Sequence, residues 1–165
     1  MTLANSTNLQ LCTFALGDLL LGIDVRRVQE VLRHQPTTHV PLAARLISGL
    51  INLRGQIVLT IDLAHCLSLK SPNPRKQSML VVIRSEDGPA SLIVDGIRDI
   101  VNVHTDSHEP IPETMDSDKR IFFKAAYKMP KQLLLELDPD RILDFVSLNG
   151  NSNGFLQASD NTVFE

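Results

Sequence analysis

The chain has 165 residues, 43% of them hydrophobic, which suits one domain or two small lobes with a shared core. A net charge of -3 and an aromatic content of 4% argue against nucleic-acid binding, which needs a basic surface and rings for base stacking. The sequence contains neither a signal-peptide pattern nor an apolar run of about 18 residues that could span a membrane. We therefore expect a cytoplasmic protein with reduced cysteines.

The first part of the chain predicts a hairpin followed by a helical turn. Residues 1–8 are polar, and we expect them to be frayed. Gly17-Asp18 is a two-residue turn signal between two predicted strands, Leu9–Leu16 and Leu19–Ile23. Asp24 is a suitable N-cap, so we expect a short helical turn after it that gives way to a strand in the run Val28–Arg33.

Two apolar runs on either side of Arg54-Gly55 predict a second hairpin. Its strands are Leu50–Leu53 and Gln56–Leu63, and the return strand is apolar on both faces, which is typical of a strand buried on both sides. A short helix is expected to follow, ending at Leu67. The polar, proline-bearing segment 71–76 is the expected boundary between two lobes.

The second half repeats this pattern of short strands. Pro139 at a first helical position predicts a short closing helix that ends at Val146. Residues 147–165 are rich in Asn, Ser and Gly and predict a disordered tail. The count is about ten strands in two groups of five, which indicates a mainly β fold built from barrels or sandwiches. The strands predicted in this half are Met79–Arg84, Ala90–Val94, Ile97–Val103, Ile121–Tyr127 and Gln132–Leu137.

No convincing set of catalytic or metal-binding groups is visible in the sequence. It contains no glycine-rich phosphate loop and no nucleophile elbow. His104 and His108 have the i, i+4 spacing of a helical metal site, but they follow a predicted strand and precede a proline, which favours a solvated loop. Cys66 follows His65, yet sequence neighbours rarely face each other as nucleophile and base, and Cys12 and Cys66 are expected to be small core residues. We expect neither an enzyme nor a cofactor.

Two charged residues interrupt apolar segments and are candidates for a contact surface. Arg54 at the tip of its hairpin is either a solvated turn residue or a presented contact, and the pattern leaves both open. Arginine offers a planar fork of donors and is enriched at protein interfaces. Glu30 stands within the apolar run Val28–Val31. A charge rimmed by apolar residues is typical of a protein–protein interface.

These motifs together resemble the CheW-like domain of bacterial chemotaxis. The resemblance spans about residues 9–146 and implies two intertwined SH3-like five-stranded barrels with short helices, with lobes at about 9–70 and 76–146. The motifs that carry it are Gly22-Ile23-Asp24-Val25, Val28-Gln29-Glu30-Val31, Asn52-Leu53-Arg54-Gly55 and Val94-Asp95-Gly96-Ile97.

The resemblance also implies a function. Members of the family are non-enzymatic adaptors without cofactors, and they couple chemoreceptors to the histidine kinase CheA in chemosensory signal transduction. The implied partners are the regulatory domain of a CheA-type kinase, mainly at the first lobe, and the cytoplasmic tip of methyl-accepting chemoreceptors, at the groove between the lobes. Such an adaptor neither binds nucleic acid nor inserts into the membrane, and it is recruited to receptor arrays at the membrane's inner face. The implied contact residues are Val28, Glu30, Gly49, Asn52, Arg54, Val94, Asp95 and Ile97.

Alternatives of two kinds remain open at this point. Thr60 and Ala64 depart from the family pattern, where proline and often a basic residue are usual, so the array could serve pilus motility or phototaxis. From the residues alone, the chain could instead be a small-molecule-binding regulatory module that holds its ligand between paired barrels. A hydrolase that uses Cys66 and His65 is the third hypothesis.

Overall fold

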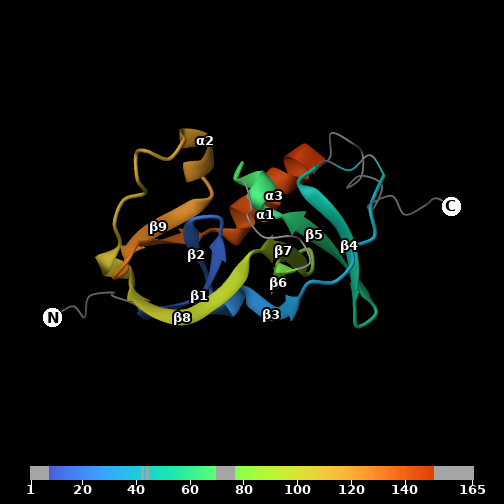
Figure 1. Ribbon diagram of the computed structural model, residues 1–165, viewed down its shortest axis with the longest axis horizontal. Helices are drawn as coiled ribbons and strands as arrows, with labels where there is room; N and C mark the ends of the chain where they lie inside the picture. Colours follow the sequence, from blue (N-terminus) through green and yellow to red (C-terminus); the bar gives the residue numbers. More distant parts are fainter. Residues whose placement is uncertain (1–7, 42, 44, 70–76, 151–165) are drawn as a thin grey trace.

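Two five-stranded sheets make up most of the computed structural model, which describes residues 8–41, 43, 45–69 and 77–150 (Figure 1). Sheet A has the strand order β8-β1-β2-β10-β9, and sheet B has the order β3-β6-β7-β5-β4. The prediction of a mainly β fold with ten strands in two groups of five is confirmed. The strands are β1 (Asn8–Leu16), β2 (Leu19–Asp24), β3 (Val28–Arg33), β4 (Ile47–Leu53), β5 (Gln56–Asp62), β6 (Met79–Ile83), β7 (Ala90–Val94), β8 (Gly96–His104), β9 (Phe123–Lys128) and β10 (Leu133–Leu137).

Short helical pieces connect these strands, and three of them start at an aspartate that ends or follows a strand. Asp24, Asp62 and Asp138 each accept a hydrogen bond from a backbone N–H two or three residues later, at 2.9, 3.2 and 3.0 Å. Such a side chain satisfies a donor that the first helical turn leaves free. The helical pieces are η1 (Val25–Arg27), α1 (Leu63–Cys66), η3 (Thr105–Ser107), α2 (Ser117–Arg120) and α3 (Pro139–Gly150).

The two sheets divide the chain differently from the expected lobe boundary at 71–76. Sheet B consists of five strands that are consecutive in the chain, β3 to β7. Sheet A combines β1 and β2 with β8 to β10. The segment 71–76 itself lies outside the described residues, but both strands that flank it belong to sheet B. They do so because β7 inserts between them, parallel to β5 and antiparallel to β6. The chain changes sheets after β2 and again after β7.

Both ends of the folded region also differ from expectation. Asn8 already belongs to β1, and α3 continues to Gly150, four residues beyond the predicted end of the closing helix. The side chain of Asn149 donates to the carbonyl of Phe145 at 2.8 Å, so this polar residue extends the last turn instead of ending it. The rest of the predicted frayed start and disordered tail, residues 1–7 and 151–165, lies outside the described residues.

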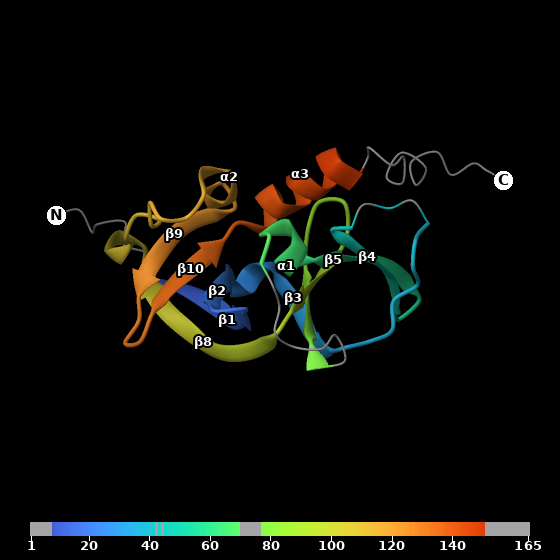
Figure 2. The ribbon, with the colours of Figure 1, turned by 45° about the horizontal axis from the view of Figure 1, so that its top comes forward.

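A shared apolar core joins the two sheets. The largest buried cluster contains residues from both sheets together with Leu63 and Cys66 of α1 and Ile142 and Val146 of α3. Helix α3 lies across the junction of the sheets (Figure 2). Its Phe145 ring meets the ring of Phe122 edge-on, with 5.1 Å between the ring centroids. Two smaller clusters belong to one sheet each. Burial across the junction therefore fixes one sheet against the other. Within the described residues, no helix has both the length and the apolar character needed to cross a membrane.

Candidate functional site

The hairpin of β4 and β5 presents Arg54 on a tightly held turn. Arg54 and Gly55 have φ angles of +54° and +86°, the two positive values that a type I′ hairpin turn requires. The side-chain oxygen of Asn52 accepts a hydrogen bond from the N–H of Gly55 at 2.8 Å. Asn52 therefore holds the backbone of the turn, and Arg54 is fixed at its tip.

Arg54 forms a two-pronged ion pair with Glu30. Its two terminal nitrogens donate to the two carboxylate oxygens of Glu30 at 2.6 and 2.7 Å. Hydrogen bonds from Arg54 lower the pKa of Glu30, so the pair stays charged at neutral pH. Glu30 lies on β3 and Arg54 follows β4, and these are the two edge strands of sheet B. The pair thus links the two edges, with the Arg54 side chain 72% exposed and that of Glu30 only 17%.

Ile57 is an exposed apolar side chain on the same hairpin. It lies opposite Asn52 in the register of the hairpin, and it is 62% exposed. Sequence reasoning missed it, because the apolar return strand was interpreted as buried on both faces. The signal was present in the register, since a two-residue turn places Ile57 beside polar Asn52 on the outer face. We call Glu30, Asn52, Arg54 and Ile57 the hairpin surface.

Gly49 supports the hairpin surface from inside the fold. It is buried, with φ at +151°, and a Cβ there would lie 2.5 Å from the carbonyl oxygen of Thr38. Thr38 and Leu50 exchange two backbone hydrogen bonds, of 2.8 and 2.9 Å. The missing side chain of Gly49 therefore lets the segment after β3 pair with β4. Its position gives it a structural role, and its buried Cα offers a partner little surface.

The predicted contact residues of the second lobe do not form one surface. Val94 is fully buried in the core. Asp95 accepts a hydrogen bond from the N–H of Gly17 at 2.7 Å, which ties the crossing after β7 to the turn between β1 and β2. Ile97 is half-buried on β8, as is Val28 on β3, and Ile100 on β8 is exposed. Both strands lie along the same side of the molecule in Figures 1 and 2.

The groups considered for catalysis or metal binding do not assemble into a site. Cys66 is buried, and burial raises the pKa of its thiol to about 12, so it is protonated at neutral pH and a poor nucleophile. His65, the preceding residue of the same short helix, is exposed. Among the described residues, no group of three or more His, Cys, Asp or Glu side chains is placed to hold a metal ion. This geometry speaks against the hydrolase hypothesis.

Two ionisable side chains are buried together in sheet A. Glu136 on β10 is buried, and Tyr127 on β9 donates to its carboxylate at 3.4 Å. Burial raises the pKa of Glu136, and the charges of Asp24 and Asp138 add to this, while Lys124 and Tyr127 act against it. Burial likewise raises the pKa of Tyr127 to about 12.

Glu136→Gln should stabilise the protein at neutral pH and much less at pH 4. The pKa of Glu136 is raised in the folded state. The stabilisation that its protonated carboxyl gives the fold is therefore fully present below the unfolded pKa of about 4.3 and is lost as the pH rises through the folded pKa. Urea midpoints of wild type and variant at both pH values measure this. Glu113→Gln, at an exposed position, is the control and should change neither midpoint. An equal effect of Glu136→Gln at both pH values would exclude ionisation as the cause.

Comparisons with known proteins match the same region. The family model of the CheW-like domain matches residues 10–147. A probable chemotaxis protein CheW of Rhizobium etli is 29% identical over 136 residues, covering 81% of this chain and 88% of the relative. The chemotaxis protein CheW of Bacillus subtilis is 28% identical over 144 residues, covering 87% and 92%.

The fold agrees with a solved member of that family. The crystal structure of the scaffolding protein TtCheW from Thermoanaerobacter tengcongensis superposes with a TM-score of 0.72 at 26% identity, covering 84% of this chain and 89% of that one. The matched region begins within β1 and contains the other nine strands and the hairpin surface. The chain therefore belongs to the CheW-like domain family.

Proposed function

We propose that this chain is a non-enzymatic adaptor that couples chemoreceptors to a CheA-type histidine kinase. The observation that carries the proposal is the Arg54–Glu30 pair on an exposed hairpin of a CheW-like domain. Its geometry suits recognition rather than chemistry, because the carboxylate of Glu30 is held by both terminal nitrogens of Arg54, and the exposed fork can bind a protein surface.

The hairpin surface is the proposed contact for the regulatory domain of the kinase. It combines an arginine held in a fixed orientation with an exposed apolar side chain, the two features most often found at the centre of an interface. Because Glu30 already holds one side of the guanidinium, little side-chain entropy remains to be lost on docking.

The side formed by β3 and β8 is the proposed contact for the cytoplasmic tip of a chemoreceptor. Val28 and Ile97 are half-buried there, and Ile100 is one of the most exposed large apolar side chains in the described region. This would place the chain in receptor arrays at the inner face of the membrane, held there by its partners.

Reconstitution with purified partners tests the proposed function. The full chain is mixed with a CheA-type kinase and a receptor signalling fragment from the same genome and analysed by size-exclusion chromatography. We expect a binary complex with each partner, with Kd on the order of 1 μM, and a ternary complex with both. Receptor-dependent stimulation of kinase autophosphorylation should require the chain. Absence of both binary complexes would refute the adaptor function.

A further inference from the structure

A groove with a volume of about 530 Å³ lies between sheet A and the segment after α1, and no β8 residue is among its described lining. Helices α1 and α2 lie along its side of the molecule, and β8 runs along the opposite side in Figures 1 and 2. One wall comes from sheet A and includes Leu19 and Leu133, and the other comes from the segment after α1, with Leu67 and Leu69. Neither the hairpin surface nor Val28, Ile97 and Ile100 contribute to its lining.

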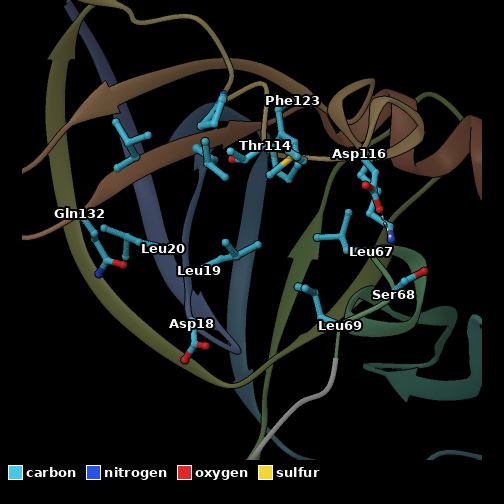
Figure 3. Close-up of a pocket in the computed structure, with 15 residues that line it drawn as sticks. Asp18, Leu19, Leu20, Leu67, Ser68, Leu69, Thr114, Asp116, Phe123 and Gln132 are labelled. Carbon is cyan, nitrogen blue, oxygen red and sulfur yellow. Dashed lines mark ion pairs between the residues drawn. The ribbon is translucent and has the colours of Figure 1, made fainter.

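The walls of this groove are apolar. Leu19 and Leu69 face the open space from opposite sides, as Figure 3 shows. Leu19, Leu69, Met115 and Leu133 are half-buried and rest on the main core, so each leaves apolar surface open to the groove. A hollow of this size and composition can bury several apolar side chains of a ligand or partner.

Among the described residues that line the groove, acidic groups outnumber basic ones. Two carboxylates, of Asp18 and Asp116, and one ammonium group, of Lys119, are among its lining residues. Lys119 is 21% exposed and Asp116 76%, with 3.9 Å between ammonium and carboxylate, so the cation is covered while the acid faces solvent. Asp18 is exposed and forms no hydrogen bond or ion pair with another described residue. The described part of the mouth therefore favours a ligand with positive charge.

We propose that this groove binds a segment of a partner protein that presents apolar side chains beside a lysine or arginine. The apolar side chains would occupy the space between Leu19 and Leu69, and the cation would pair with Asp18 at the rim. A second copy of the chain is a poor occupant, because the same groove on both copies would bring the two acidic rims together. A partner segment bound in this groove would leave the hairpin surface and the β8 side free. The chain could therefore bind this partner in addition to the kinase and the receptor of the proposed function.

A pair of synthetic peptides tests this proposal on the full-length chain. Both are helices of about 14 residues with leucines along one face, flanked by lysines in one peptide and by glutamates in the other. Fluorescence anisotropy should show that the lysine peptide binds about fivefold more tightly than the glutamate peptide. Leu69→Glu, which places a charge on the apolar wall, should weaken binding of the lysine peptide by roughly tenfold or more.

Charge reversal at the exposed rim controls for damage to the fold. Asp18→Lys should remove or invert the preference between the two peptides, whereas Asp87→Lys, the same change in another exposed turn, should leave it intact. Equal affinity for the two peptides, or full binding by a natively folded Leu69→Glu protein, would overturn the proposal. So would binding of n-decylamine without the peptide, or a dimer that Leu69→Glu dissociates, since these would assign the groove to a small amine or to a second copy.

Discussion

Arg54→Glu should weaken binding of the kinase regulatory domain by about 30-fold or more while leaving the fold intact, as expected for an arginine at the centre of an interface. The substitution removes the exposed fork and places a carboxylate against Glu30, whose side chain is only 17% exposed. The two acids then repel each other, so the turn presents negative charge where the wild type presents a cation. Isothermal titration calorimetry with the purified domain measures the loss, and the far-UV circular dichroism spectrum reports on the fold.

Two further variants separate the ion pair from the arginine itself. In the double variant Glu30→Arg with Arg54→Glu, the pair can reform with its charges exchanged, but the fork no longer lies at the hairpin tip. If Arg54 is the recognition residue, the double variant binds as poorly as Arg54→Glu alone. If the pair acts only by holding the two edges of sheet B together, the double variant regains binding. Wild-type affinity in Arg54→Glu would exclude the hairpin surface as the kinase contact.

Sequence reasoning succeeded where structure depends on neighbouring residues. The Gly17-Asp18 and Arg54-Gly55 turns and the aspartate that caps η1 were predictable because each depends on only a few residues. Which strands pair within each sheet could not be predicted in this way. Parallel pairing of β5 with β7 and of β2 with β10 joins segments far apart in the chain, and no local pattern encodes these partners.

The candidate site shows the same limit. Glu30 and Arg54 were each visible as charges among apolar residues, but only the fold brings them within hydrogen-bonding distance across 24 residues of chain. Val94 and Asp95 carry the family motif, yet one lies in the core and the other holds a turn. A motif identifies residues that matter without separating those that contact a partner from those that hold the contact surface in place.

Gly49→Ala should destabilise the protein by about 3 kcal/mol, the largest loss of stability that we expect from a single added methyl group here. The new Cβ would overlap the carbonyl oxygen of Thr38 at 2.5 Å, and the φ of +151° is one that residues with side chains rarely adopt. Relief of the overlap requires Thr38 to move away, which breaks the hydrogen bonds of 2.8 and 2.9 Å that it exchanges with Leu50. Urea unfolding measures the change in the free energy of unfolding.

Gly55→Ala is the matched control for this loss. Gly55 also has a positive φ, +86°, but no atom lies within 4 Å of the place that a Cβ would take, so only the backbone strain of about 1 kcal/mol should remain. The difference between the two variants isolates the close approach of Thr38 to β4. Gly49→Ala protein that is still folded at low temperature should also bind the kinase domain more weakly, because the edge strand that carries Arg54 loses its support. Equal losses of stability in both variants would show that strain alone explains Gly49, and the segment after β3 would then have no part in holding the hairpin surface.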